Sequence, residues 1–151
     1  MQTHLVIPDT IQFEYTMHRL LGRRPTYFDV STFGVPSLKA INRLCQYSLP
    51  IRILVGIPAG LTKEQAWGYN DLRRLYKDLK ITFRFAKSHH AKLYVAEHST
   101  YDEVIIGSRN IGDSSWKEVG VVFTDTSKAC RKLFLQWWNE SSTSAEVCRK
   151  Q

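Results

Sequence analysis

Residues 89–125 read HHAKLYVAEHSTYDEVIIGSRNIGDSSWKEVGVVFTD, and this stretch decides the fold. It holds three short apolar runs, at residues 92–96, 103–106 and 119–123, separated by polar or glycine-containing segments. Short runs that are rich in Val and Ile and bounded by such segments predict β-strands. Because these strands follow one another without an intervening helix, the second half of the chain is expected to form β-hairpins.

The first half of the chain has a different pattern, in which strands alternate with helices. Apolar runs at residues 27–33, 51–57 and 81–86 predict strands, and the segments between them, 36–47 and 63–80, predict helices. Strands separated by helices indicate parallel crossover connections. The two halves together predict an α/β fold, with a mixed β-sheet flanked by helices on both faces.

Further helices are expected near both ends of the chain. The first covers about residues 9–21, with Asp9 as its N-cap, and the last covers residues 126–139. The expected apolar face of the last helix comprises Ala129, Leu133 and Trp137. Residues from about 140 to 151 are expected to be a frayed tail. The sequence shows no repeat and no long linker, so residues 1–151 are expected to form a single domain.

The composition is that of an ordinary soluble globular protein, with 43% hydrophobic and 23% charged residues. The three cysteines are widely spaced and include no Cys-x-x-Cys pair, which argues against a disulfide framework or a zinc ribbon. No signal peptide or run of membrane-spanning length is evident. We therefore expect a cytoplasmic protein without a membrane partner.

The charge balance indicates a polyanionic partner. The formal net charge is +7 and the sequence pI is about 9.5. Nucleic acid fits this surplus better than a membrane surface does, because no amphipathic basic helix accompanies it. A surplus that serves only solubility remains the alternative on charge alone.

A group of polar residues beside the three apolar runs has the chemistry of phosphodiester cleavage. His90 and Lys92 form His-x-Lys, and Gly107, Ser108 and Asn110 form Gly-Ser-x-Asn. An imidazole can attack phosphorus, an ammonium can neutralise phosphate oxygens, and a hydroxyl and an amide can donate further hydrogen bonds. The second motif carries more of the specificity, because three fixed positions arise by chance more rarely than two.

This pair of motifs resembles the phospholipase D superfamily, and within it the single-motif nucleases and the metal-independent restriction endonucleases. The resemblance implies a phospholipase D-like fold, a phosphohistidine intermediate, no metal or other cofactor, and a homodimer in which two motif copies meet. One departure concerns Glu97, which stands five positions after Lys92, where the superfamily usually has Asp. The Gly-Ser pair also arrives a few residues late.

The resemblance implies a role for each site residue. His90 would be the nucleophile, and Lys92, Ser108 and Asn110 would hold the phosphate oxygens. Glu118 stands directly before the last apolar run, and a carboxylate there could accept a hydrogen bond from the His90 ring and fix its tautomer. Strand alternation places His89 on the opposite face from His90, which makes His89 the poorer candidate. A zinc site that uses His89, His90 and His98 lacks a fourth ligand at suitable spacing.

Several basic residues are candidates for nucleic-acid binding. Arg109 lies inside Gly-Ser-x-Asn and is the expected additional phosphate contact. A basic run leads toward His90 along the chain and could draw a phosphate backbone to the site. The candidates in this run are Arg73, Arg74, Lys77, Arg84 and Lys87. The alternative interpretation of this run is a solvated helix face.

The sequence therefore predicts a metal-independent phosphodiesterase, an endonuclease that cleaves DNA or RNA, with DNA preferred, in a homodimeric active site. The turn at residues 111–116 is the expected dimer contact, with Trp116 as its buried anchor. Two alternatives stay open. A non-catalytic nucleic-acid-binding module would use the same basic surface, and a lipid phosphodiesterase would share the motif.

Overall fold

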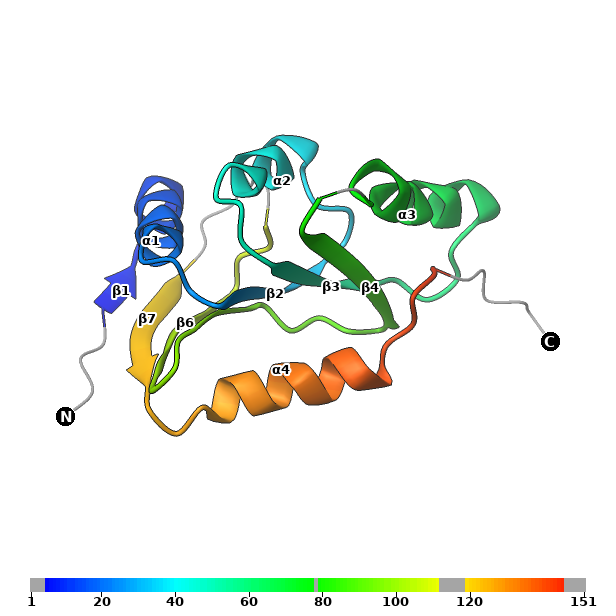
Figure 1. The fold of residues 1–151 in the computed structure, drawn as a ribbon. Coiled ribbons are helices and arrows are strands. Elements are labelled where there is room, and N and C mark those ends of the chain that lie inside the picture. The colour runs from blue at the N-terminus through cyan, green and yellow to red at the C-terminus, as the bar shows by residue number, and fades with distance from the viewer. Residues whose placement is uncertain (1–4, 78, 112–118, 146–151) are drawn as a thin grey trace.

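A computed structural model of the chain describes residues 5–77, 79–111 and 119–145. These residues form four helices and one seven-stranded sheet in the order β1-β7-β6-β5-β2-β3-β4 (Figure 1). The strands are β1 (Leu5–Ile7), β2 (Tyr27–Phe33), β3 (Ile51–Ile57), β4 (Ile81–Lys87), β5 (Leu93–Glu97), β6 (Asp102–Gly107) and β7 (Gly120–Asp125). The helices are α1 (Thr10–Gly22), α2 (Leu38–Cys45), α3 (Lys63–Leu75) and α4 (Ala129–Glu140).

The sheet is mixed, as the two patterns of the sequence predict. The crossover strands β2, β3 and β4 are parallel to one another, and β5, β6 and β7 pair antiparallel as successive hairpins. The two halves join where β5 pairs antiparallel with β2. Helices α1, α2 and α3 cover one face of the sheet and α4 covers the other (Figure 1). The predicted α/β class is therefore confirmed.

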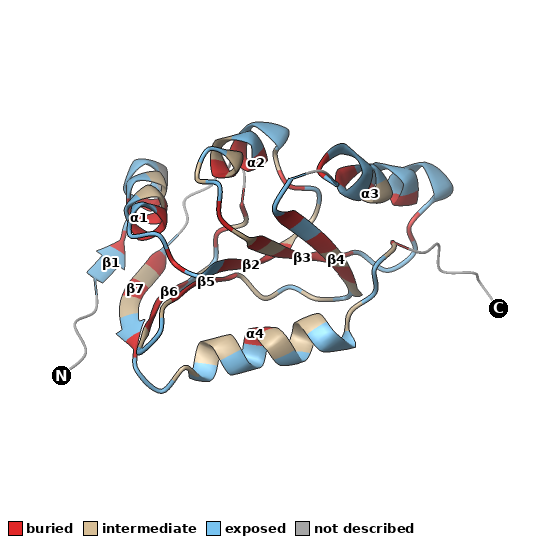
Figure 2. Ribbon diagram, in the orientation of Figure 1, coloured by how far each residue is buried: buried red, intermediate tan, exposed pale blue. Residues whose placement is uncertain are grey.

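Apolar side chains fill both spaces between the sheet and the helices, as the buried residues in Figure 2 show. The larger cluster joins the sheet to α1, α2 and α3 through residues such as Leu20, Ile41 and Leu72. The smaller cluster joins it to α4 through Phe134 and Val95. Both faces of β5 are consequently buried, so polar side chains can reach solvent only beyond its ends.

The ends of the helices follow local sequence signals. Asp9 caps α1 by accepting a hydrogen bond from the Gln12 backbone N–H at 2.9 Å, as predicted. Thr62 and Gln65 form a reciprocal capping box at the start of α3. Helix α3 ends at Leu75 rather than near residue 80, because the chain must turn there to start β4 at Ile81.

The predicted apolar face of α4 is wrong by about one residue. Phe134 is the fully buried side chain of this helix, whereas Ala129 and Leu133 are exposed. Trp137 does pack against the sheet, together with Trp138. The bulky aromatic rings decide which face turns inward, because they bury the largest apolar area.

The frayed tail is also a wrong prediction as far as Ala145. The backbones of Ser142 and Phe85 exchange two hydrogen bonds of 2.8 Å, which add a bridge to the outer edge of β4. The Asn70 side chain then bonds both backbone groups of Ala145, at 2.8 and 3.0 Å. Strand β1 was not predicted, because a three-residue edge strand leaves almost no periodic signal.

In the part of the chain that the structure describes, no helix is long and apolar enough to cross a membrane.

Candidate active site

Four strand ends bring the two sequence motifs to one edge of the sheet. Leu93, the first residue of β5, pairs with Ser31 near the carboxyl end of β2 and with Ile106 near the end of β6. Gly107 at the end of β6 pairs with Gly120, the first residue of β7. His-x-Lys directly precedes β5 and Gly-Ser-x-Asn directly follows β6, so the hairpin topology places them side by side.

The ring of Phe33 is the centre of the site. The His90 imidazole stacks on it with the ring centres 3.8 Å apart and the planes 19° from parallel. The Lys92 Nζ lies 6.0 Å from the centre of the same ring. His90 is exposed and Lys92 is half-buried. Phe33 therefore holds the candidate nucleophile beside a cation at the surface, where a phosphate can enter.

Asn110 is fixed against the same part of β2. Its Oδ1 accepts a 2.8 Å hydrogen bond from the Phe33 backbone N–H and a 3.3 Å hydrogen bond from the Thr32 hydroxyl. Thr32 in turn accepts a hydrogen bond from the Ile111 N–H at 3.0 Å. Because a backbone N–H can only donate, the acceptor must be the carboxamide oxygen. The amide nitrogen therefore points away from β2 and can donate to a ligand.

Gly107 allows β6 and β7 to approach closely beside this site. A Cβ on Gly107 would overlap the carbonyl oxygen of Val119 and the Cα of Gly120. The neighbouring Ser108 uses that approach, because its backbone N–H donates to the Val119 carbonyl at 3.0 Å and its Oγ accepts from the Val119 N–H at 3.2 Å. Ser108 is thus exposed but held in place at the start of the motif.

His89 contacts different elements from His90. Its Nε2 lies 2.7 Å from the Ser31 Oγ, and its ring meets Trp137 of α4 edge to face at 4.9 Å. Since the Ser31 hydroxyl donates its proton to the Ala91 carbonyl at 2.7 Å, the His89 Nε2 must be the donor to Ser31. Burial lowers the pKa of His89, with the charges of His90 and Lys92 adding to the effect. His89 is therefore an anchor for the segment that carries His90.

Gly56, near the end of β3, is a site residue that the sequence did not single out. A Cβ at this position would overlap the carbonyl oxygen of His89 and would lie 3.0 Å from the Phe33 ring. The segment with the two histidines therefore lies directly on the backbone of β3. Only glycine leaves this space, so Gly56 sets the position of His90 from beneath.

Several known structures resemble the chain in fold. No protein family model matches the sequence, and no curated protein matches it. Nuc, a phospholipase D family member from Salmonella typhimurium, superposes with a TM-score of 0.67 at 13% identity, over 99% of this chain and 100% of Nuc. The chain has the phospholipase D fold.

Two larger proteins contain a similar unit. Phosphatidylserine synthase from Haemophilus influenzae matches with a TM-score of 0.61 at 14% identity, over 95% of this chain and 40% of the synthase. The archaeal chromatin protein TrmBL2 matches with a TM-score of 0.59 at 12% identity, over 93% of this chain and 54% of TrmBL2. The chain therefore corresponds to one phospholipase D unit, whereas these two proteins extend well beyond it.

Glu97 lies far from His90 and Lys92 in this phospholipase D fold. It ends β5, so about five residues at roughly 3.3 Å each separate it from Lys92, a span of about 16 Å. The carboxylate forms ion pairs with Arg52 and Arg131 beneath α4, and the Arg131 contact measures 2.9 Å. Glu97 therefore belongs to a buried ionic network and not to the group of candidate residues around Phe33.

The network continues on both sides of Glu97. Arg52 binds Asp29 through two hydrogen bonds of 2.7 and 3.1 Å, and Arg131 binds Asp102 with a 3.0 Å hydrogen bond from its Nε. Asp29 is fully buried, and this burial, together with the nearby carboxylate of Glu97, raises the pKa of Asp29 to about 8. The network joins α4 to the sheet by charge as well as by apolar contact.

The two glutamates of the sequence analysis should respond differently to removal of their charge. Glu97→Gln should lower the free energy of unfolding by about 3 kcal/mol, because two half-buried arginines lose a partner, while the rate of cleavage changes little. Glu118 lies outside the described residues, and its proposed role stays a prediction. Glu118→Gln should lower the rate strongly and leave stability unchanged. Urea unfolding and initial rates measure both effects, and the reverse order of effects on the rate would assign the orienting role to Glu97.

Most of the predicted nucleic-acid contacts lie away from the site. Arg73, Arg74 and Lys77 precede β4, and the following Lys80 carbonyl accepts a hydrogen bond from the Ile51 N–H at the amino end of β3. The seven residues of β4 then span about 20 Å before the chain reaches the edge of the sheet that carries the two motifs (the catalytic edge). The basic run thus approaches His90 along the sequence but begins at the opposite edge of the sheet. These three residues therefore do not lie beside His90, and their contact with nucleic acid stays a prediction.

Arg84 is occupied by contacts within the protein. Its guanidinium donates a 2.6 Å hydrogen bond to the Ser141 carbonyl and lies 5.5 Å from the ring centre of Trp138. These contacts join β4 to the end of α4. Lys87, at the carboxyl end of β4, is the member of the predicted basic run that reaches the catalytic edge, and it is exposed there.

Arg109 is buried, which corrects its prediction as a surface phosphate contact. It is 3% exposed, and its guanidinium lies 5.2 Å from the ring centre of Phe13 in α1. Its carbonyl accepts a 2.8 Å hydrogen bond from the buried Tyr94 hydroxyl. The position alternates with Ser108 and Asn110 along the chain, so its side chain turns toward α1 when theirs turn toward the site.

Proposed function

We propose that this protein is a metal-independent phosphodiesterase that cleaves nucleic acid, with DNA as the preferred substrate. The observation that carries the proposal is the gathering of His90, Lys92 and Asn110 around Phe33 at one edge of the sheet. An exposed imidazole that shares the Phe33 surroundings with a cation and an amide suits in-line attack on a phosphodiester. The phospholipase D fold and the net charge of +7 support the same substrate class.

Each residue has a defined step in this mechanism. The imidazole of one His90 attacks phosphorus, the bond to the leaving oxygen breaks, and a phosphohistidine forms. Lys92, Ser108 and Asn110 stabilise the charge on the non-bridging oxygens. A second imidazole gives its proton to the leaving oxygen and then takes a proton from the water that attacks the phosphohistidine. Hydrolysis returns the first His90 to its starting state.

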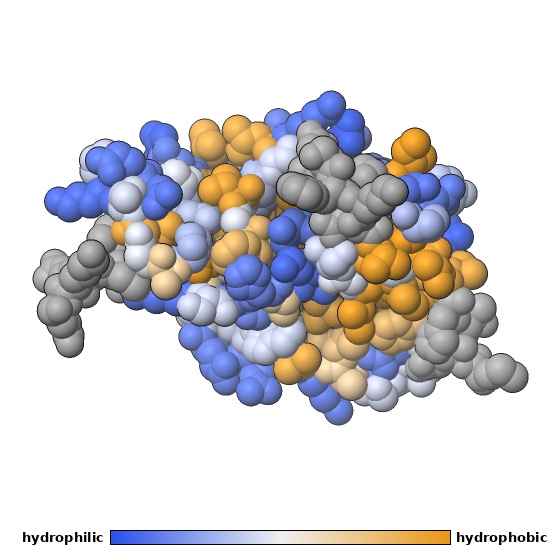
Figure 3. Space-filling view, turned by 180° about the vertical axis from the view of Figure 1, so that it is seen from behind, coloured by the Kyte–Doolittle hydropathy of each residue, from blue (hydrophilic) through white to orange (hydrophobic). Residues whose placement is uncertain are grey.

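The second imidazole is proposed to come from a second copy of the chain. The sequence holds one His-x-Lys, so a monomer has one of the two required histidines. An exposed apolar surface at this end of the sheet supports the proposal, because Val6, Ile106 and Val119 are 67%, 45% and 57% exposed. The pairing of Val121 with both Val6 and Ile106 makes this surface continuous, and Figure 3 shows an apolar area on the β7 side of the molecule. Of the predicted contact at residues 111–116, Ile111 is buried in the core, and residues 112–116, with Trp116, lie outside the described residues.

Subunit mixing tests the shared site. With a fourfold excess of His90→Ala subunits that exchange freely, roughly one wild-type subunit in five keeps a wild-type partner. Activity per wild-type subunit should therefore fall about fivefold if both histidines are needed at one phosphorus. Trp67→Ala, an exposed change on α3 away from the motifs, serves as the matched excess partner and should cause no loss. Full activity of a monomer in sedimentation measurements at the assay concentration would contradict the dimeric mechanism.

Hydrolysis should persist in excess EDTA, because Lys92, Ser108 and Asn110 supply the charge stabilisation. The assay uses labelled duplex DNA, single-stranded DNA and a phosphatidylcholine substrate in parallel. Turnover of the nucleic acids alone is expected. Activity that disappears with chelation and returns with magnesium would contradict the proposal. Binding without turnover would favour a non-catalytic nucleic-acid-binding module, and turnover of the lipid would favour a lipid phosphodiesterase.

A further inference from the structure

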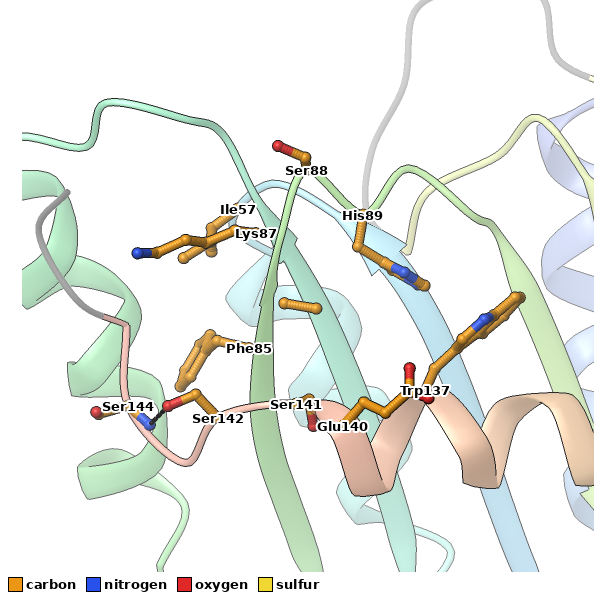
Figure 4. Close-up of a pocket in the computed structure, with 11 residues that line it drawn as sticks. Ile57, Phe85, Lys87, Ser88, His89, Trp137, Glu140, Ser141, Ser142 and Ser144 are labelled. Carbon is orange, nitrogen blue, oxygen red and sulfur yellow. Dashed lines mark hydrogen bonds between the residues drawn. The ribbon is translucent and has the colours of Figure 1, made fainter.

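A separate pocket of about 470 Å³ opens beside the catalytic edge, between the end of β4, the end of α4 and the docked tail (Figure 4). This volume is within the usual range for small-molecule sites. Its wall combines aromatic rings, hydroxyl groups and one charge of each sign. The lining residues that matter here are Phe85, Lys87, His89, Trp137, Glu140 and Ser142.

The pocket has a built wall. The tail side is held by the backbone bridge between Ser142 and Phe85 and by the two hydrogen bonds of Asn70 to Ala145. The opposite side is held by the contact of His89 with Trp137 and by the hydrogen bond of His89 to Ser31. Each wall is therefore fixed by interactions within the protein, so the shape exists before a ligand arrives.

The chemistry of the wall suits a nucleobase. Trp137 presents a large aromatic surface, and base–aromatic stacking is the general means by which proteins hold single-stranded nucleic acid. Burial lowers the pKa of the neighbouring His89, which favours the uncharged form of its ring beside a base. Serine hydroxyls and the Glu140 carboxylate offer hydrogen-bond partners to the polar edge of a base.

The two charged groups give the pocket a direction. The Lys87 ammonium points away from His89, whereas Glu140 lies at the end of α4 beside Trp137 (Figure 4). A nucleotide would place its phosphate near Lys87 and its base toward Glu140, because the carboxylate repels the phosphate. His89 lines this pocket while the adjacent His90 lies against Phe33 in the catalytic site. Two adjacent residues of the chain therefore line the two neighbouring sites.

We propose that this pocket binds an unpaired nucleobase next to the cleaved phosphate, and that single-stranded nucleic acid is therefore the preferred substrate. The proposal rests on the proposed function and adds its substrate class. A base in a duplex is stacked and paired, and it can enter a pocket only if it leaves the helix at a cost of a few kcal/mol. A single strand offers its base without that cost. The pocket thus favours single strands over duplexes of the same sequence.

The test is equilibrium binding in the His90→Ala background, in which the substrate is not cleaved. The probes are fluorescein-labelled single-stranded DNA, single-stranded RNA and duplex DNA of one sequence, together with single strands that carry one abasic position each. Trp137→Ala should weaken single-strand binding about tenfold and leave duplex binding unchanged. Trp67→Ala, which removes an exposed tryptophan from α3, is the matched control and should change neither. The DNA and RNA probes show which strand the pocket accepts.

The abasic series locates the base. At one position, removal of the base should weaken binding about tenfold when Trp137 is present and should have no effect in Trp137→Ala. The two changes remove the same contact between the base and the ring. Lys87→Ala, an exposed change that leaves the core intact, should weaken every single strand but keep this positional penalty. The proposal would be contradicted if an abasic position weakened binding equally with and without Trp137. It would also be contradicted if Trp137→Ala and Trp67→Ala weakened single-strand binding equally. Failure of the proposed function would show separately, as absence of cleavage by the protein with His90.

Discussion

His90→Ala should abolish turnover, with a loss of about 10⁴-fold or more, because it removes the imidazole that stacks on Phe33 and is proposed to attack phosphorus. His89→Ala should retain much of the activity, with a loss of about tenfold through a less well-held segment. The two histidines are adjacent, yet one faces the catalytic site and the other faces α4. Initial rates with both variants, at matched protein concentration and checked folding, measure the difference.

This pair of variants separates the loss of the nucleophile from the loss of packing around it. A His89→Ala protein that is as inactive as His90→Ala would show that the assignment of His90 as the sole nucleophile is wrong. His90→Gln offers a further control, because it keeps a polar side chain of similar size over Phe33 but has no nucleophilic nitrogen. Its activity should equal that of His90→Ala.

Gly56→Ala should lower turnover about 100-fold, because the added Cβ displaces the His89 backbone and a shift of about 1 Å misplaces His90. The same overlap should lower the free energy of unfolding by about 1–3 kcal/mol. Gly68→Ala is the matched control, since nothing lies within 4 Å of a Cβ at this helical position. It should keep full activity and gain up to about 1 kcal/mol of stability. Near-normal turnover by Gly56→Ala would show that β3 does not position the histidine.

The part of the fold that follows from local patterns was predictable. Asp9 begins a helix because its side chain accepts from the backbone three residues later, and that signal is visible in the sequence alone. The parallel and antiparallel halves follow from whether a helix intervenes between strands. The sequence also identified the candidate site residues of the two motifs, because these motifs stand beside predicted strands. They are His90, Lys92, Ser108 and Asn110.

Contacts between distant segments could not be predicted in this way. Phe33 and Gly56 come from strands more than 30 residues before His90, and neither belongs to a motif. The distance of Arg73, Arg74 and Lys77 from His90 could not be predicted for a related reason, because a strand that ends at the site begins about 20 Å from it. Arg109 was misplaced because a residue between two site residues turns its side chain the opposite way.

The central claim is that His90 attacks phosphorus and becomes covalently linked to the substrate. Rapid acid-free quenching of the reaction with a labelled oligonucleotide, followed by peptide mass spectrometry, tests it most directly. The mechanism predicts a phosphoramidate adduct on the peptide that contains His90, formed in EDTA and absent from the His90→Ala protein. Cleavage without any such adduct, or an adduct on another residue, would contradict the account.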